Sequence, residues 1–391
     1  MSNSFKTFLK HTAKDFHNQS VNPPVVRAST IIFKSMKDIR KTQAKAIKNP
    51  TGGHYDYGRQ GTSTTYILQK ILTKLEESYH VFTTPTGFGA VFLAIFSVTR
   101  PGDEIIVADP VYSPTRILTE NFLKEFNIKT TFYDPHDLKT LEKSITKNTK
   151  LIFVENPGSN SFDFQNLGKI VSIAKKHKIL TAMDNTWGTP YFLKPIKLGF
   201  DMAIASATKY YSGHSDVMGG SLAVNKKVFP KVKAAERITG LRLGPDDAYL
   251  ITRGLRTLDV RLDRHRENAK KVAEFLSKNK KFKLLYPYKK DSYNFRMWKK
   301  YYSGASGLMG VQIKSKNVNS IRKFVNSLKL FGYGYSWGGF ESLALHQEFR
   351  ETGKRKYLKL KKDEHLVRFH IGLEDPIDLI ADIKQALKHL K

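Results

Sequence analysis

Short apolar runs alternate with amphipathic stretches through the middle of the chain. The runs at 105–108, 151–154, 180–183 and 203–205 are almost wholly apolar and end in polar or turn-forming residues. Runs of this length with such boundaries are typical of buried strands, and the stretches between them, such as 170–177, have helical spacing of apolar residues. This alternation predicts an α/β fold with a mostly parallel sheet covered by helices on both faces.

The sequence on either side of this alternation predicts further parts of the chain. Residues 1–60 are expected to form a mostly irregular arm with a Pro- and Gly-containing loop at 49–53, and 64–77 carries leucine and isoleucine on one helical face. Gly244-Pro245-Asp246 opens a helix that we expect to run to about 276, because proline is favoured at the first helical position.

A smaller α+β domain is expected beyond that helix. Strands are predicted near 307–313 and 367–373, with a helix near 318–328, and Asp375-Pro376 begins a terminal helix. The predicted parts are an arm (1–60), a large domain (61–255) and a C-terminal domain (256–391), with the linking helix starting at about 246.

Polar side chains follow each of the four predicted strands of the large domain. Asp109, Glu155 and Asp184 end the first three strands, and Lys209 follows the fourth. Ligands of open α/β sheets bind at the carboxyl ends of the strands. The topology therefore predicts one cleft that these side chains share.

Composition narrows the class of protein. The 391 residues are 40% hydrophobic and include no cysteine, which excludes disulfides, thiolate metal sites and a cysteine nucleophile. The N-terminus lacks the apolar core of a signal peptide, and the longest apolar stretch, 89–98, is half the length of a membrane span. We expect a cytoplasmic protein with no membrane association.

The formal net charge of +31 allows an anionic partner. Residues 295–302 interleave aromatic and basic side chains, which can bind single-stranded nucleic acid. However, the basic residues are spread over the whole chain and no known binding module is recognisable, so no nucleic-acid partner is expected. No metal is expected either, and His214 and His370 are interpreted as scaffold residues.

The turn after the fourth strand contains Ser206, Thr208 and Lys209. A lysine amine can form a Schiff base with an aldehyde cofactor, and the hydroxyls beside it can bind phosphate. Taken alone, Lys209 is more simply a surface residue of a lysine-rich chain. Asp184, at the end of a neighbouring strand, could pair with a pyridinium nitrogen or could simply cap a turn.

Two further features lie at the same predicted edge. Gly87 and Phe88 open an apolar helix, where free N–H groups can hold a phosphate. Tyr112, beyond another strand end, offers an aromatic face for stacking. An amine, a carboxylate, a phosphate cradle and an aromatic platform together fit pyridoxal 5'-phosphate.

Longer motifs extend this set, namely Tyr57-Gly58-Arg59-Gln60-Gly61-Thr62, Thr86-Gly87-Phe88, Asp184-Asn185-Thr186, Ser206-Ala207-Thr208-Lys209 and Arg253-Gly254-Leu255-Arg256-Thr257-Leu258. From about residue 20 to its end, the chain resembles the Cys/Met-metabolism family of pyridoxal-phosphate enzymes. The stretches 335–343 and 367–375 resemble its cystathionine β-lyase branch. The resemblance implies the aspartate-aminotransferase-like fold (fold type I) with a sheet of the seven-stranded type.

The resemblance also implies roles for individual residues. It makes Lys209 the cofactor anchor, Asp184 the partner of the pyridine nitrogen and Tyr112 the stacking ring. The phosphate would be held by Gly87, Phe88, Ser206 and Thr208, and by Tyr57 and Arg59 of an adjacent subunit. The chain would therefore form a homodimer with shared active sites, and we expect dimers to pair into a tetramer.

For the substrate, the resemblance implies that Arg368 holds the α-carboxylate, with Tyr335, Ser336 and Trp337 beside it. The implied reaction is β-elimination on L-cystathionine, giving homocysteine, pyruvate and ammonia in methionine biosynthesis. Lys209 would act as the base at Cα, and Lys209 or Tyr112 would protonate the leaving group. Racemisation of alanine and β-elimination on cysteine S-conjugates remain alternatives.

Four positions bear on substrate choice. Ser159 and Trp337 favour the β-lyase branch, whereas Asp56 and Gln60 stand where familiar β-lyases carry an aromatic residue and an arginine. Arg116, close to Tyr112 in sequence, could supply the missing charge or could point to solvent.

Overall fold

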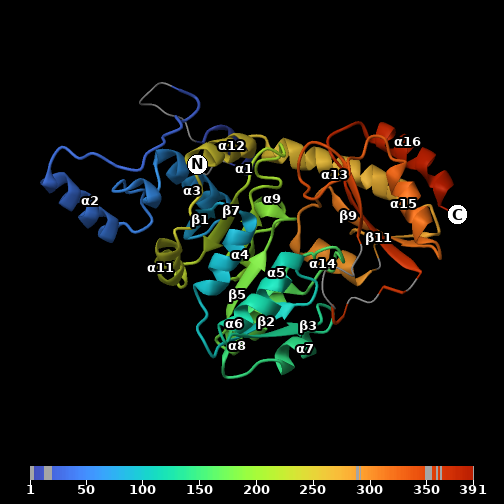
Figure 1. Cartoon of the computed structure of the whole chain (residues 1–391), viewed down its shortest axis with the longest axis horizontal. Helices are drawn as coiled ribbons and strands as arrows, with labels where there is room; N and C mark the ends of the chain where they lie inside the picture. Colours follow the sequence, from blue (N-terminus) through green and yellow to red (C-terminus); the bar gives the residue numbers. More distant parts are fainter. Residues whose placement is uncertain are drawn as a thin grey trace.

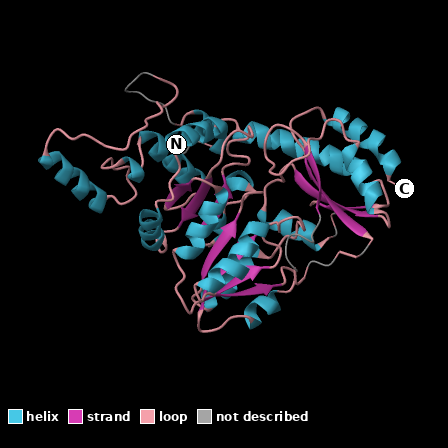
Figure 2. Ribbon diagram, in the orientation of Figure 1, coloured by secondary structure: helices cyan, strands magenta, loops and turns pink. Residues whose placement is uncertain are grey.

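The computed structural model describes residues 4–12, 20–287, 290, 292–347, 355–357, 360–361 and 363–390. These residues form two sheets, each with its own hydrophobic core and its own helices. Figure 2 shows the strands as two separate groups flanked by helices. Helices α12 (Pro245–Leu255) and α13 (Leu258–Leu276) run along the top of both groups in Figure 1.

The larger sheet has seven strands in the order β1-β7-β6-β5-β4-β2-β3. Neighbouring strands from β3 to β6 are parallel, and β7 runs antiparallel to both β1 and β6. The prediction of a mostly parallel, seven-stranded-type sheet is therefore confirmed. The strands are β1 (His80–Thr84), β2 (Glu104–Ala108), β3 (Lys129–Tyr133), β4 (Thr149–Glu155), β5 (Leu180–Asp184), β6 (Met202–Ser206) and β7 (Gly220–Val224).

Helices around this sheet bury the apolar faces that the sequence pattern predicts. In α8 the buried side chains are Leu167, Ile170, Val171, Ile173 and Ala174, spaced to lie on one face. The helices of this layer are α3 (Ser63–Leu75), α4 (Gly87–Phe96), α5 (Ser113–Ile117), the π-helical η2 (Leu118–Phe122), α6 (Leu123–Glu125), α7 (Leu138–Lys143), α8 (Leu167–Lys176), α9 (Thr189–Phe192), α10 (Pro195–Leu198) and α11 (Phe229–Thr239).

The second sheet is antiparallel, in the order β10-β11-β9-β8. In β11, Val367 and Phe369 are fully buried. Alternation along a strand turns Arg368, between them, to the opposite face. The elements here are β8 (Phe282–Leu285), α14 (Tyr293–Tyr301), β9 (Leu308–Lys314), α15 (Val318–Asn326), β10 (Leu343–Gln347), β11 (Glu364–His370), α16 (Pro376–Ala386) and η4 (Leu387–His389).

The N-terminal region is more helical than predicted. It contains α1 (Phe5–Lys10), α2 (Met36–Lys48) and η1 (Gly58–Gln60). Helix α2 has no buried residue and is capped by the Ser35 side chain, which accepts a hydrogen bond from the Asp38 N–H, so no strong apolar face announces it in the sequence. It lies apart from the two sheets, at the left of Figure 1. Residues 1–3 and 13–19 of the predicted arm lie outside the described residues.

The single helix expected over 246–276 is wrong, because two helices occupy this stretch. The carbonyl oxygen of Gly254 accepts hydrogen bonds from the side chains of Arg261 (2.8 Å) and Thr257 (3.3 Å). The backbone therefore breaks at Arg256 and Thr257 before α13 begins. In the described part of the chain, no helix combines the length and the apolar character needed to cross a membrane.

Candidate active site

The carboxyl ends of the parallel strands bring the predicted polar residues to one edge of the larger sheet. Ser206 ends β6, Asp184 ends β5 and Glu155 ends β4, and Glu155 is in register with Asp184. Asp109 directly follows β2. The predicted shared edge therefore exists, and Lys209 lies in the turn that follows β6.

Lys209 sits in contact with residues of the second sheet. Its Nζ donates to the Oγ of Ser336 at 2.5 Å and lies 5.4 Å from the ring centroid of Trp337. Burial and the positive charge of Arg368 lower the pKa of Lys209 to about 8, although the charge of Asp184 acts in the opposite direction. Roughly a tenth of this amine is therefore unprotonated at pH 7, far more than for an ordinary lysine, and the neutral form is the one that a nucleophile or base requires.

Asp184 is held by its chain neighbour Thr186. The Oδ1 of Asp184 accepts hydrogen bonds from the Thr186 N–H (2.9 Å) and hydroxyl (2.6 Å). The same hydroxyl oxygen accepts from the Ser206 N–H at 2.9 Å. Burial raises the pKa of Asp184, against the hydrogen bonds of Thr186 and the charge of Lys209. A cationic ring nitrogen placed beside this carboxylate would stabilise its charged form.

The first turn of α4 faces Ser206 closely. A Cβ added to Gly87 would lie 2.6 Å from the Cβ of Ser206, so only glycine fits there. Thr86 caps the helix by accepting from the Gly89 N–H at 2.9 Å, and the first N–H groups of a helix are free to bind an anion. Thr208 exchanges hydrogen bonds with Gly219 across the adjoining turn. The start of α4, the end of β6 and the turn that follows it therefore lie close together.

Tyr112 lies at this sheet edge, and 47% of its surface is exposed to solvent. Its N–H donates to the Oε2 of Glu155 at 2.6 Å. Burial, followed by the charges of Glu155 and Asp184, raises the pKa of Tyr112, so its hydroxyl is protonated at neutral pH. Burial and Asp184 also raise the pKa of Glu155 well above its usual value.

The sequence placed Glu155 at the shared sheet edge without a chemical role, and it gave no role to Thr186, which lies within the motif Asp184-Asn185-Thr186. The available signal for Glu155 was its place at the end of a buried strand, like Asp184.

The second sheet contributes Arg368 and the turn before β10. The Nη2 of Arg368 donates to the carbonyl of Ser336 at 3.1 Å, and the Gly338 N–H donates to Nε2 of His370 at 3.1 Å. Ser336 has φ 81°, a conformation that residues other than glycine rarely adopt and that clusters at functional sites. Tyr335 is 83% exposed beside this turn.

Tyr57 and Arg59 are placed elsewhere. The Arg59 guanidinium lies 5.5 Å from the Tyr57 ring centroid and donates to the carbonyl of Arg237, at 3.5 Å, in α11. The contacts described for this pair are thus with the arm and α11.

Arg116 does not point to solvent, so that expectation is wrong. It is 2% exposed, and its guanidinium pairs with Asp109 (2.9 Å) and Glu120 (3.1 Å) and lies 3.9 Å from the Phe132 ring centroid.

The aromatic and basic stretch 295–302 is largely part of α14. Met297, Trp298 and Tyr301 pack against the larger core, and the Trp298 indole donates to the Gly304 carbonyl at 2.8 Å. These rings therefore serve packing. Among the described residues, no group of three or more His, Asp or Glu side chains is arranged to hold a metal ion.

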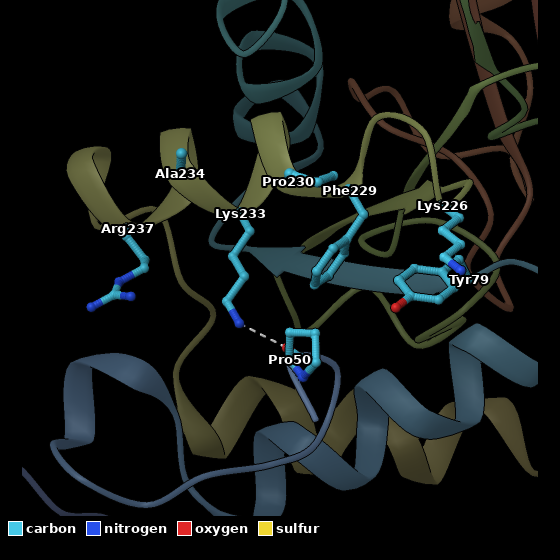
Figure 3. A pocket seen from close by; sticks show the side chains of 8 residues that line it. All are labelled: Pro50, Tyr79, Lys226, Phe229, Pro230, Lys233, Ala234 and Arg237. Carbon is cyan, nitrogen blue, oxygen red and sulfur yellow. Dashed lines mark hydrogen bonds between the residues drawn. The ribbon is translucent and has the colours of Figure 1, made fainter. Parts of the chain in front are cut away.

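A separate cavity of about 460 Å³ lies against α11. Figure 3 shows Phe229 and Tyr79 beside it, with Lys233 donating to the Pro50 carbonyl at 2.8 Å. It shares no residue with the cluster around Lys209. Its lining is Pro50, Tyr79, Lys226, Phe229, Pro230, Lys233, Ala234 and Arg237.

Comparison with known proteins agrees with this geometry. Residues 6–388 match the model of the family described as Cys/Met metabolism PLP-dependent enzyme. Cystathionine beta-lyase of Bordetella avium is 36% identical over 370 residues, which cover 94% of this chain and 92% of that protein. L-alanine/L-glutamate racemase of Wolbachia pipientis is 36% identical over 379 residues, covering 95% and 93%.

A solved structure from Campylobacter jejuni, proposed as an O-acetylhomoserine (thiol)-lyase, superimposes with a TM-score of 0.88 at 29% identity. The match covers 99% of this chain and 100% of that one. That structure contains N'-pyridoxyl-lysine-5'-monophosphate.

Proposed function

Because the chain belongs to the Cys/Met-metabolism family of pyridoxal-phosphate-dependent enzymes, we propose that it is a carbon–sulfur lyase that catalyses β-elimination on L-cystathionine. With the consumption of one water molecule, the products would be homocysteine, pyruvate and ammonia. The observation that carries the proposal is the position of Lys209, whose amine has a pKa of about 8 and lies beside Ser336, Trp337, Asp184 and Arg368.

Pyridoxal 5'-phosphate is the cofactor of this family, and the residues at the sheet edge fit it. Lys209 would anchor the aldehyde, Asp184 would pair with the ring nitrogen, and Tyr112 would stack on the ring. The phosphate would lie in the cradle of Gly87, Phe88, Ser206 and Thr208. The crowding of Gly87 against Ser206 supports this assignment, since it leaves backbone N–H groups within reach of a ligand.

The substrate would be oriented from the second sheet. Arg368 can hold the α-carboxylate by a bidentate pair of hydrogen bonds, with Ser336 and Trp337 beside it and Tyr335 at the entrance. The hydrogen bond from Arg368 to the Ser336 carbonyl supports this arrangement, because it fixes the guanidinium near Lys209. The α-carbon would then lie between Arg368 and the amine.

Proton transfers would be made by Lys209 and Tyr112. Once the substrate amine has taken the place of Lys209 at the cofactor aldehyde, the freed neutral amine of Lys209 would remove the Cα proton. The bound cofactor would supply a ring that accepts the electron pair left at Cα. The sulfur then departs from Cβ as a thiolate, a fair leaving group because a thiol has a pKa of about 8.5. Either the Lys209 ammonium or the Tyr112 hydroxyl can protonate it, since both carry a proton at that point.

The active unit would be a dimer in which Tyr57 and Arg59 bind the cofactor phosphate of the adjacent subunit. The contacts of Arg59 with Tyr57 and with the Arg237 carbonyl in α11 support this, as does the position of α2 apart from both sheets in Figure 1. We further propose that dimers pair into a tetramer.

Racemisation of alanine or a related amino acid is the second candidate, favoured by the similarity to the Wolbachia racemase. It needs the same removal of the Cα proton, followed by return of a proton to the opposite face. The two reactions differ in that only β-elimination releases a keto acid.

The test is to supply the purified holoenzyme with L-cystathionine and with L-alanine in parallel. Pyruvate and homocysteine from the first substrate support the lyase. If the enzyme forms D-alanine from L-alanine and releases no keto acid from cystathionine, the racemase would replace the lyase as the proposed function.

A further inference from the structure

The loop that carries Tyr112 is held within the larger sheet at several points. The Oδ1 of Asp109 accepts from both terminal nitrogens of Arg116, at 3.1 and 2.9 Å. The Pro110 carbonyl accepts from the Ser159 N–H at 2.6 Å, and the Tyr112 N–H is held by Glu155. These contacts do not involve the carbonyl oxygens of Val111 and Ser159, which accept hydrogen bonds from another part of the chain.

A short segment from the C-terminal part of the chain, Arg355–Tyr357, provides those contacts. It lies in sequence between β10 and β11. The Nη1 of Arg355 donates to the Ser159 carbonyl at 2.8 Å, and its Nη2 reaches the Val111 carbonyl at 3.4 Å. One guanidinium thus bridges the residue before Tyr112 and the turn after β4.

The backbone of the same segment is fixed to the other end of the loop. The N–H groups of Lys356 and Tyr357 donate to the two carboxylate oxygens of Asp109, at 3.1 and 2.9 Å. Asp109 is fully buried, where hydrogen bonds to a charged group are strong and costly to break. The segment Arg355–Tyr357 is therefore hydrogen-bonded to the loop that carries Tyr112 at two places, Asp109 and Val111.

Charge agrees with this arrangement. Burial lowers the pKa of Arg355, while the negative charges of Glu155 and then Asp109 act in the opposite direction, and Arg116 adds a repulsive contribution. Arg355 thus stands opposite the carboxylate that holds the Tyr112 N–H. Its guanidinium can act on Tyr112 both through the Val111 carbonyl and through Glu155.

We propose that Arg355 is a positioning residue for Tyr112. By bridging the carbonyls of Val111 and Ser159, it sets the place of the Tyr112 ring over the site from the C-terminal part of the chain. The inference rests on the proposed function only in assigning Tyr112 to the cofactor. Arg355 itself touches neither cofactor nor substrate.

The test compares Arg355→Ala and Arg355→Lys holoenzymes with the unmodified enzyme. For Arg355→Ala we expect the kcat of pyruvate release from cystathionine to fall ~10- to 100-fold, because small displacements at a reacting centre have effects of that size, with a smaller change in KM. The visible circular dichroism of bound pyridoxal phosphate should weaken at unchanged cofactor content. Arg355→Lys should be intermediate, since an ammonium keeps the charge without the planar fork.

Lys356→Ala is the matched control, because it removes an exposed side chain and leaves the N–H that binds Asp109. It should behave as the unmodified enzyme. Unchanged dichroism and kcat in Arg355→Ala would overturn the proposal. If that variant does not fold, Arg355→Lys decides alone, and behaviour identical to the unmodified enzyme would overturn it as well.

A failure of the proposed function is distinguishable. An unmodified enzyme that releases no pyruvate would overturn the lyase, whereas the dichroism of the variants would still report whether Arg355 sets the Tyr112 ring against the cofactor.

Discussion

In the proposed function, the chemistry depends on Lys209. Its amine is the proposed anchor of the cofactor, so Lys209→Ala should abolish both the visible absorption of covalently held cofactor and pyruvate release from cystathionine. Absorbance of the purified protein and a coupled pyruvate assay measure the two effects. Lys194→Ala, which removes a lysine paired with Glu77 outside the site, should retain both. Colour and activity in Lys209→Ala would mean that another amine is the anchor.

The pKa of Lys209 gives a pH dependence with a definite sign. The neutral amine is the reactive form, and its fraction rises as the pH increases through the pKa of about 8, rather than through the ordinary value of 10.5. The rate at which apoprotein takes up pyridoxal phosphate should therefore increase with pH and level off above about pH 8–9.

Arg368 supplies part of that shift. Its positive charge helps to lower the pKa of Lys209, so Arg368→Gln should move the midpoint of cofactor uptake to higher pH, whereas Arg368→Lys should keep it. Stopped-flow absorbance across the neutral and alkaline range measures the midpoints. Equal midpoints in all three proteins would contradict the electrostatic explanation.

Candidate site residues could be predicted from the sequence where they follow an apolar run that marks the end of a strand. Lys209 and Asp184 follow apolar runs, so their sheet edge could be inferred from the sequence. Arg355 could not, because it meets Val111 244 positions away in sequence and binds backbone carbonyls, which leave no side-chain pattern. Arg116 was misjudged because closeness in sequence says nothing about which way a helical residue points.

At the scale of elements, the packing of α4 on β6 makes a specific prediction for Gly87. An alanine there would place its Cβ 2.6 Å from the Cβ of Ser206, so the helix start must move away from the strand end. Gly87→Ala should weaken pyridoxal phosphate binding about tenfold or more and cost about 1–3 kcal/mol of stability. Cofactor titration of the apoprotein and thermal unfolding measure these changes.

The control for that substitution is Gly244→Ala. Gly244 precedes α12 with φ −68° and has open space around an added Cβ, so both properties should stay unchanged. Equal cofactor affinity in the two variants would argue against Gly87 as part of the phosphate cradle.

Apolar runs located only part of the larger sheet, since β7 is buried along its whole length and was not predicted. The four apolar runs are the central strands β2, β4, β5 and β6, whereas β3 at the sheet edge is mostly half-exposed and has no continuous apolar run. The break between α12 and α13 depends on side chains that take the Gly254 carbonyl, which apolar spacing alone does not reveal. Local pattern therefore locates the core, and tertiary hydrogen bonds decide the interruptions.

For the whole molecule, the site joins parts that are far apart in the chain. Asp184 ends a strand of the larger sheet and Lys209 follows another, whereas Arg368 lies in the smaller sheet and Ser336 in the turn before its strand β10. The contacts described for Arg59 are with Tyr57 and with Arg237 of α11. The two sheets were predictable from the alternation of strands and helices. The relation between subunits came from resemblance alone, because a contact between chains leaves no periodicity in one sequence.

Mixed dimers test this relation directly. If each site takes Lys209 from one chain and Arg59 from the other, then a dimer of one Lys209→Ala chain with one Arg59→Ala chain retains one site with both residues. With random pairing, half of the dimers are mixed, so we expect about a quarter of unmodified activity after co-expression, well above either variant alone. Pairing Lys209→Ala with Asp184→Ala is the control, because both residues belong to the same chain's sheet edge and every site stays defective. No recovery in the first pair, or equal recovery in both, would contradict shared sites.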